Sequence, residues 1–193
     1  MAELWLIRHG ETEWSLSGAH TSRTDISLTD HGRKRAEELR DYLKGKKFAA
    51  VFTSPMQRAR ETCAIAGYGD VATIDDGLKE WDYGIYEGKT TKEIRADHPG
   101  WSVWKDEIVG GETLQHVGER ADGIIFRALA AAGEDGTAAL FAHAHILRIT
   151  AARWIGLPAE GGSLFALGTG SLSVLGFERE TRVIAGWNRG FEE

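Results

Sequence analysis

Cationic and nucleophilic side chains follow three apolar stretches of the chain. Arg8 and His9 come directly after the first stretch. Arg58 follows the second at a short distance, and His143 comes immediately after a third. A neutral imidazole is a nucleophile, and arginine binds two phosphate oxygens at once in a geometry that lysine does not match. These residue types therefore indicate a site that binds a phosphate group and attacks it.

The apolar stretches alternate with helical patterns, which is typical of α/β proteins. Apolar and β-branched runs predict strands at 4–7, 49–53, 71–74, 137–142, 163–167, 171–177 and 182–185. Helical spacing and stop signals predict helices at 29–44, 55–66, 90–98, 113–132 and 144–155, and the segment 78–88 is interpreted as an ordered loop. We expect an α/β fold, a three-layer α/β/α sandwich with a mostly parallel central sheet, in a single domain over residues 1–193.

One edge of this sheet is the expected place of the site. In open parallel sheets, ligands bind outside the carboxyl ends of the strands, and three strands would deliver their cationic or nucleophilic side chains there. Helices predicted to begin near Pro55 and Ala144 would direct free N–H groups to the same edge. Helix N-termini favour anions, and phosphate above all. The edge is therefore predicted to form a phosphate pocket.

Composition limits the classes of partner. The 29 acidic residues exceed the 23 basic ones and give a net charge of −6, which argues against general nucleic-acid binding. The sequence has neither a long apolar run that would span a membrane nor the pattern of a signal peptide. Cys63 is the single cysteine, so no internal disulfide can form and a cytoplasmic location is expected. We expect a small phosphorylated substrate, no nucleic acid and no membrane, and we leave a homodimer open.

Four motifs in register resemble those of the histidine phosphatase (phosphoglycerate mutase-like) superfamily. They are RHGETEW at 8–14, SPMQRARET at 54–62, EWDYGIYEG at 80–88 and HAHILR at 143–148. The similarity spans nearly the whole chain. Within the superfamily, the motif at 80–84 and the residues at 14–15 and 20–21 look similar to those of bacterial acid phosphatases and fungal sugar-bisphosphatases.

The resemblance implies catalytic roles for five residues. His9 would be the nucleophile and would form a phosphohistidine intermediate. Arg8, Arg58 and His143 would hold the phosphoryl oxygens and stabilise charge in the transition state. Glu80 would protonate the leaving alcohol and then help to activate water. Neither a metal nor another cofactor would be needed, because fixed positive charges take that place.

Seven further residues are expected around the substrate: Ser15, Thr21, Ser22, Trp81, Tyr83, Ala144 and His145. Ser15 and Thr21 align with positions that contact substrate in the family. Ser22 and Ala144 stand where glycine is common, which puts a backbone phosphate contact at Ser22 in doubt and leaves less room beside the histidine before Ala144. Trp81 and Tyr83 follow the expected proton donor closely, so they are candidates for the pocket wall.

Three other functions stay open beside a phosphatase acting on a sugar phosphate or a phosphorylated organic acid. The first is a phosphoglycerate mutase, although the chain lacks the inserted segments typical of mutases. The second is a metallohydrolase that binds a metal through His9, His143 and His145. The third is a non-catalytic module that binds phosphate esters. A mechanism that relies on a protonated Glu80 and a charged His143 predicts a mildly acidic or neutral pH optimum.

Overall fold

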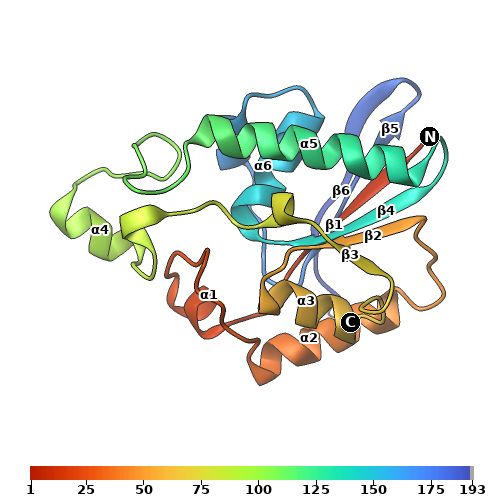
Figure 1. Cartoon of the computed structure of the whole chain (residues 1–193), viewed down its shortest axis with the longest axis horizontal. Coiled ribbons are helices and arrows are strands. Elements are labelled where there is room, and N and C mark those ends of the chain that lie inside the picture. Colours follow the sequence, from red (N-terminus) through yellow and green to blue (C-terminus); the bar gives the residue numbers. More distant parts are fainter. Residues whose placement is uncertain (192–193) are drawn as a thin grey trace.

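A central sheet of six strands organises residues 1–191, the part of the chain that this computed structural model describes. The strands are β1 (Glu3–Arg8), β2 (Ala50–Thr53), β3 (Ala72–Ile74), β4 (Thr137–Ala142), β5 (Leu172–Glu178) and β6 (Thr181–Arg189). Their order is β3-β2-β4-β1-β5-β6. The first four strands in this order run parallel, whereas β5 and β6 are antiparallel to their neighbours. The predicted mostly parallel sheet is therefore confirmed, with an antiparallel hairpin added at one edge (Figure 1).

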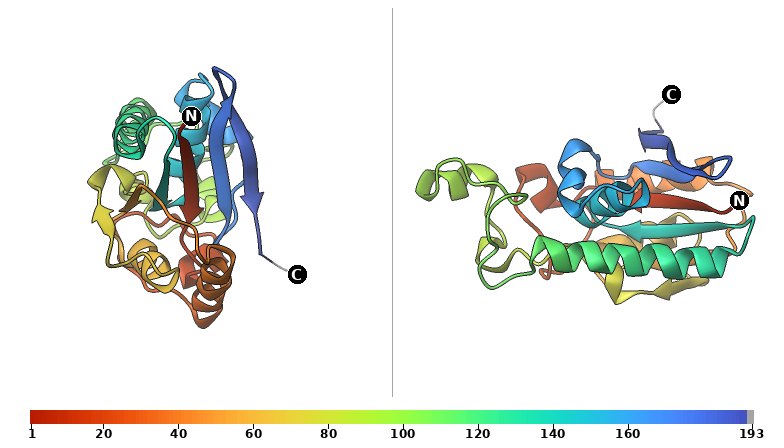
Figure 2. Two further views of the ribbon diagram at one scale, coloured as in Figure 1. Left: turned by 90° about the vertical axis from the view of Figure 1, so that its right-hand side faces the viewer. Right: turned by 90° about the horizontal axis from the view of Figure 1, so that it is seen from above.

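Helices cover both faces of this sheet. They are α1 (Glu13–Ser17), α2 (Asp30–Tyr42), α3 (Gln57–Ile65), α4 (Thr91–Asp97), α5 (Leu114–Ala132) and α6 (Ala144–Trp154), with short 3-10 helices η1 (Asp76–Leu78), η2 (Gly84–Tyr86) and η3 (Ala159–Leu164). Helices α2 and α3 lie on one face, and α5 and α6 lie on the other (Figures 1 and 2). This arrangement confirms the three-layer sandwich. Within residues 1–191, no helix combines the length and the apolar character needed to cross a bilayer.

Alternate residues of the central strands build two hydrophobic cores. On β1, Leu4 and Leu6 belong to the core cluster that includes Ile124 of α5. The neighbouring Ile7 belongs to the other cluster, together with Leu39 of α2. Successive strand residues point to opposite faces, and here both faces are covered by helices. This is why the central strands could be predicted as continuous apolar runs.

Threonine residues define where three of the helices begin. The side chains of Thr29, Thr90 and Thr113 each accept a hydrogen bond from the backbone N–H three residues later. Such N-caps satisfy N–H groups that have no partner inside the helix. Each of these helices therefore begins one residue after its threonine, close to the predicted start.

The structure differs from the sequence-based expectation in two segments. Residues 163–167 were predicted as a strand, but they form the end of η3 and the irregular stretch that follows. Carbonyl groups at both ends of this region accept hydrogen bonds from arginine side chains instead of from a neighbouring strand. Arg148 donates to the Gly162 carbonyl, and Arg8 donates to the Leu167 carbonyl. Helix α1 was not predicted, because its five residues bury no side chain and leave no apolar periodicity.

Gly10 allows the turn after β1 to pass close to α2, and this predicts a stability effect. A Cβ atom on Gly10 would lie 2.5 Å from the carbonyl oxygen of Gly32, which is backbone and cannot move aside easily. We expect Gly10→Ala to lower the free energy of unfolding by about 1–3 kcal/mol. Urea denaturation followed by circular dichroism measures this change.

Gly123→Ala is a suitable control for this experiment. Gly123 lies in α5, where a Cβ atom would meet just the end of the flexible Arg127 side chain. Alanine favours a helix over glycine by up to about 1 kcal/mol, so this variant is expected to be at least as stable as the wild type. A Gly10→Ala protein with unchanged stability would show that the turn and α2 are farther apart than described here.

Candidate active site

A small cavity lies at the carboxyl ends of β1 and β4, with a volume of about 170 Å³. Its lining residues come from the end of β1, the segment around α1, the stretch before η2 and the first turn of α6: Arg8, His9, Thr12, Trp14, Ser15, Gly18, Ala19, His20, Thr21, Glu80, Tyr83, Ala144 and His145. Pockets for drug-sized ligands measure roughly 300–1,000 Å³. This smaller cavity suits a phosphate group that carries a few further atoms.

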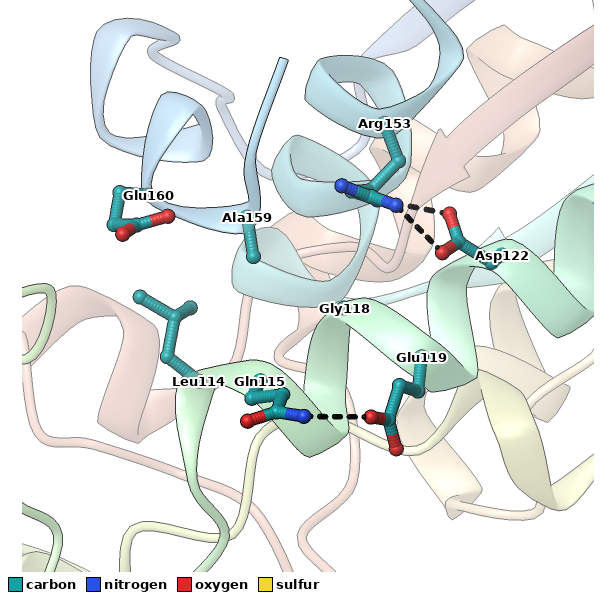
Figure 3. A pocket seen from close by; sticks show the side chains of 8 residues that line it. All are labelled: Leu114, Gln115, Gly118, Glu119, Asp122, Arg153, Ala159 and Glu160. Carbon is teal, nitrogen blue, oxygen red and sulfur yellow. Dashed lines mark hydrogen bonds and ion pairs between the residues drawn. The ribbon is translucent and has the colours of Figure 1, made fainter. Parts of the chain in front are cut away.

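A wider pocket of about 360 Å³ lies between α5, α6 and η3, but it lacks comparable chemistry (Figure 3). Its Arg153 donates two hydrogen bonds to Asp122, at 2.9 and 2.8 Å. Gln115 donates to Glu119 at 3.0 Å. None of the residues that line this pocket is a histidine, serine or cysteine. We therefore take the smaller cavity, which Arg8, His9 and Glu80 line, as the candidate active site.

Hydrogen bonds hold His9 in one tautomer. The Nδ1 atom lies 2.7 Å from the Gly10 carbonyl oxygen. A carbonyl oxygen can only accept, so Nδ1 carries the proton and, in a neutral ring, Nε2 keeps its lone pair. The Gly10 N–H donates to the Thr62 hydroxyl at 2.9 Å, which fixes the turn that carries this carbonyl. His9 therefore presents a nucleophilic Nε2 atom.

The surroundings of His9 also keep the ring neutral. Burial lowers the pKa of His9 well below 6.5, and the positive charges of Arg8 and Arg58 lower it further. Burial lowers the pKa of Arg8 to about 10, so that Arg8 stays charged at neutral pH. The Arg8 Nε atom is buried and has no hydrogen-bond partner among the described residues. The cavity thus contains a neutral imidazole beside a cation that can still donate to an anion.

Arg58 lies behind the cavity and organises the loop that borders it. It occupies the first turn of α3 and is completely buried. Its Nε atom donates to Nδ1 of His143 at 3.2 Å. Its terminal nitrogens donate to the carbonyl oxygens of Thr21, Ser22 and Thr24. Neither Arg58 nor His143 lines the cavity in this structure, so their contact with a phosphoryl group stays a prediction.

His143 accepts a hydrogen bond from Arg58, and this contact favours the neutral form of the ring over the charged form expected from the sequence. Because Arg58 Nε can only donate, the Nδ1 atom of His143 accepts, and the ring proton resides on Nε2. Nε2 donates to the Ser54 hydroxyl at 2.8 Å. Burial and the charge of Arg58 lower the pKa of His143 well below 6.5. Its ring centroid lies 5.2 Å from that of His9, so the two rings are neighbours.

These contacts also bear on the metallohydrolase hypothesis. Both ring nitrogens of His143 are engaged, one by Arg58 and one by Ser54. Within residues 1–191, no group of three or more histidine, cysteine, aspartate or glutamate side chains is placed to hold a metal ion. The arrangement of His9, His143 and His145 therefore does not form the ligand set that this hypothesis requires.

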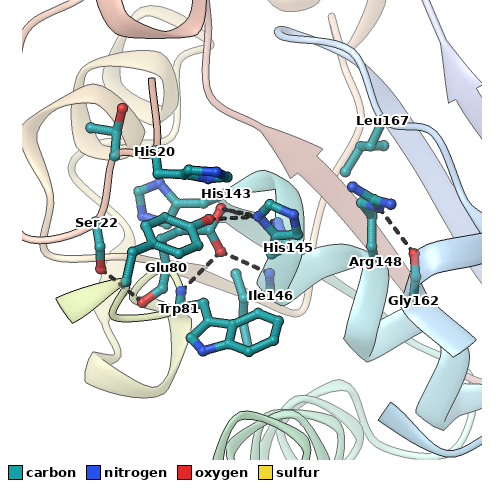
Figure 4. A network of polar contacts seen from close by, with 12 residues as sticks. His20, Ser22, Glu80, Trp81, His143, His145, Ile146, Arg148, Gly162 and Leu167 are labelled. Atoms are coloured by element: carbon teal, nitrogen blue, oxygen red, sulfur yellow. Dashed lines mark hydrogen bonds and ion pairs between the residues drawn. The ribbon is translucent and has the colours of Figure 1, made fainter. Parts of the chain in front are cut away.

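Glu80 forms the acidic part of the cavity and is held by backbone N–H groups (Figure 4). Its Oε1 atom accepts from the amides of Trp81 and Ile146, at 3.0 and 2.9 Å. Its Oε2 atom accepts from the amide of His145 at 3.0 Å. Two of these donors belong to the first turn of α6, where the helix dipole favours a negative charge. The carboxylate of Glu80 is thus fixed at the N-terminus of α6.

Three neutral rings form one wall of the cavity. The hydroxyl group of Tyr83 and the Nδ1 atom of His145 are hydrogen-bonded at 2.6 Å. The ring of His20 lies 4.8 Å from that of Tyr83, centroid to centroid. Trp81 was predicted to line the cavity, but it does not. Its indole is buried and donates to the Glu112 carbonyl at 2.9 Å. Trp81 packs behind the wall, 6.0 Å from the ring of His145.

The other predicted substrate residues divide into two groups. Ser15, Thr21 and Ala144 line the cavity. Ser22 does not: its N–H donates to the Glu87 carboxylate at 2.9 and 3.0 Å, and its hydroxyl donates to the Glu80 carbonyl at 3.2 Å. Its amide is thus used inside the protein, which agrees with the doubt raised by a serine at this position.

His20 is a cavity residue that the sequence analysis did not select. It lies in the loop after α1, where no periodic pattern signals a role. Its N–H donates to the Lys89 carbonyl at 2.9 Å, and its carbonyl accepts from the Gly88 N–H at 2.8 Å. The signal in the sequence was the resemblance at positions 20–21, which includes His20 but implied no role for it.

The neutral state of His9 predicts the pH dependence of catalysis. A group with a pKa well below 6.5 is already deprotonated above that pH, so kcat/KM should not be lost as the pH falls from 8 to 6.5. The acid limb that reports protonation of His9 should therefore lie below pH 6.5. Steady-state hydrolysis of p-nitrophenyl phosphate across this range measures it. A rate that already falls between pH 8 and pH 7 as acid is added would contradict the low pKa.

The fold and the cavity define an α/β protein with a buried, neutral histidine beside a charged arginine. The chain belongs to the histidine phosphatase superfamily, branch 1, whose family model matches residues 4–190. It is a phosphatase of the histidine type.

Relatives of known name agree with this assignment. The chain is 41% identical to an acid phosphatase from Mycobacterium tuberculosis, over 94% of this chain and 90% of that protein. It is 35% identical to the sedoheptulose 1,7-bisphosphatase of Saccharomyces cerevisiae, over 80% of this chain and 68% of that protein. A solved structure of an open reading frame product from Mycobacterium tuberculosis covers 99% of each chain, with a TM-score of 0.91 and 36% identity.

Proposed function

We propose that this protein hydrolyses small phosphate monoesters, such as sugar phosphates or phosphorylated organic acids, through a phosphohistidine intermediate on His9. The observation that carries the proposal is the hydrogen bond from His9 Nδ1 to the Gly10 carbonyl, which leaves Nε2 unprotonated in the cavity. The charged Arg8 lies in the same cavity and can bind the phosphoryl oxygens. Glu80 lines the same cavity, and we assign it the role of proton carrier.

The first step transfers the phosphoryl group to the enzyme. Nε2 of His9 attacks phosphorus while the bond between phosphorus and the ester oxygen breaks. Glu80, carrying a proton taken from the solvent, passes this proton to the departing oxygen. Arg8, together with Arg58 and His143 behind it, stabilises the charge on the phosphoryl oxygens. The alcohol leaves, and the phosphoryl group stays on His9.

The second step returns the enzyme to its starting state. Water attacks phosphorus, the bond to Nε2 breaks, and the water proton moves to the Glu80 carboxylate. Inorganic phosphate leaves, and His9 is again neutral, with Nδ1 protonated and donating to the Gly10 carbonyl. The fixed geometry of both side chains favours this sequence, because neither must be repositioned between the steps.

The names of the relatives favour a phosphatase that accepts sugar phosphates. The relatives described above are an acid phosphatase and a bisphosphatase of a seven-carbon sugar. We further propose a cytoplasmic location and no binding to nucleic acid or membrane, supported by the net charge of −6 and the single cysteine. A homodimer is the assembly to test, by light scattering of the purified chain.

A quench experiment with a radiolabelled ester tests the intermediate. After rapid mixing and quenching in alkali, which preserves phosphohistidine, label is expected in the peptide that contains His9. Released phosphate should exceed enzyme by many turnovers. Transfer of the phosphoryl group between phosphoglycerate positions at a rate above phosphate release, with a bisphosphoglycerate primer, would instead indicate a mutase. Turnover without any labelled His9 peptide would contradict the proposed intermediate.

A further inference from the structure

The wall formed by His20, Tyr83 and His145 faces the part of a substrate that is not the phosphate. All three residues line the cavity, and their rings form a row with Tyr83 in the middle. The ring centroids are 4.8 Å apart for His20 and Tyr83 and 5.7 Å apart for Tyr83 and His145. Each comes from a different part of the chain: the loop after α1, the stretch before η2, and α6. The wall therefore offers a contact surface for the leaving group of an ester whose phosphorus faces His9.

The wall carries no charge at neutral pH. Burial lowers the pKa of His20, and burial together with the charge of Arg148 lowers the pKa of His145 well below 6.5. Burial and the negative charge of Glu80 raise the pKa of Tyr83 well above 10. Two ring nitrogens of the wall, Nδ1 of His20 and Nε2 of His145, have no hydrogen-bond partner among the described residues. They remain free for a ligand.

Fixed charges of both signs lie around the wall. The cations that act on it from outside the cavity are Arg58 and Arg148, and both donate to backbone carbonyl groups. Glu80 lies against the wall, with its Oε2 atom 3.9 Å from Nδ1 of His145. Glu87 lies behind it and is held by the amides of Ser22 and Thr24. Among the residues that line the cavity, Arg8 is the one arginine or lysine, and the phosphate itself requires it. Among the residues that line the cavity, a second anionic group on the substrate would thus meet the Glu80 carboxylate and no cation besides Arg8.

We propose that this wall selects monoesters whose leaving group is an uncharged polyol, such as glycerol or a sugar with one phosphate, and that His20 is a specificity-determining residue. A hydroxyl group donates and accepts, as a neutral imidazole does, so the two are matched. A carboxylate can only accept and carries the same sign of charge as Glu80. This inference rests on the proposed phosphatase activity and divides the substrate class that the activity leaves open.

Glycerol 3-phosphate and 3-phosphoglycerate form a matched pair for the test. They differ in one group, a hydroxymethyl in the first and a carboxylate in the second. At pH 7 we expect kcat/KM, measured as phosphate release, to be about tenfold or more higher for glycerol 3-phosphate, because a site discriminates by leaving polar groups unpaired or by opposing like charges. Equal or better hydrolysis of 3-phosphoglycerate would overturn the inference.

A charge placed at His20 should shift this preference. The variant His20→Arg is expected to lower the ratio of the two kcat/KM values by about fivefold or more, because it gives the carboxylate a cation. His20→Gln keeps a neutral polar group and should retain the ratio. Leu16→Arg adds the same charge on exposed α1, outside the cavity, and should also retain it. An unchanged ratio in a folded His20→Arg protein would remove His20 from the proposal.

p-Nitrophenyl phosphate separates failure of this inference from failure of the proposed function. An enzyme that hydrolyses none of the three esters would contradict phosphatase activity itself. An enzyme that hydrolyses the nitrophenyl ester but not glycerol 3-phosphate would keep the activity and overturn the polyol preference. Circular dichroism of each variant confirms that a changed ratio does not come from unfolding.

Discussion

His9→Ala is expected to lower kcat for hydrolysis of p-nitrophenyl phosphate by about 10³-fold or more, since loss of a nucleophile removes the covalent route altogether. The remaining residues still bind the phosphate, so KM should change far less than kcat. The labelled peptide of the quench experiment should also disappear. Steady-state kinetics and the quench experiment, performed on the same preparation, measure both effects.

His98→Ala is the matched control for this substitution. His98 follows α4, is exposed, and makes no side-chain hydrogen bond among the described residues. It should retain full activity. Because His9 is buried, the melting temperature of the His9→Ala protein must be measured as well, so that lost activity is not confused with lost folding. A folded His9→Ala protein with substantial turnover would show that another group attacks the phosphate.

Glu80→Gln is expected to lower kcat by about 10²- to 10⁴-fold, the usual contribution of general acid–base catalysis. The loss should be smaller for p-nitrophenyl phosphate than for an alkyl ester, because nitrophenolate leaves without a proton. Stability should fall too, since one carboxylate oxygen becomes an amide NH₂ that faces backbone N–H donors at the start of α6. Kinetics with both esters and thermal unfolding measure the two consequences.

Glu93→Gln provides the corresponding control. Glu93 also accepts a backbone N–H at a helix N-terminus, that of Thr90, but it lies on exposed α4 outside the cavity. Its substitution should leave kcat/KM unchanged for both esters. Equal losses for the nitrophenyl and the alkyl ester in Glu80→Gln would indicate that Glu80 positions the site rather than carrying a proton.

Residues that follow strands could be located from the sequence, because chain direction and strand burial decide where they lie. The runs before His9 and His143 are apolar on both faces, so these strands had to lie inside a parallel sheet and end at the same edge. The distance of 5.2 Å between the two ring centroids follows from this arrangement. The same reasoning placed Arg58 at the start of a helix.

Features that depend on individual hydrogen bonds could not be predicted. The neutral form of His143 results from an arginine that donates to it, and no spacing in the sequence reveals which side of an imidazole faces a donor. His20 reaches the cavity because residues 88–89 pair with its backbone, across a long separation in the chain. Ser22 lies outside the cavity for a similar reason, because its N–H donates to the Glu87 carboxylate. These positions depend on loop conformations, which are set by hydrogen bonds to distant parts of the chain.

The buried neutral imidazoles lower the stability of the native state in acid. His9, His143 and His145 bind protons less readily in the native state than in the denatured state, where an ordinary pKa of about 6.5 returns. Below that pH, unfolding is accompanied by proton uptake, and each such histidine raises the unfolding equilibrium constant by up to about tenfold per pH unit. Above it, the penalty vanishes. The burial that keeps His9 neutral therefore also makes the native state sensitive to acid. Unfolding of the protein, rather than titration of His9, can then set the lower pH limit of this enzyme.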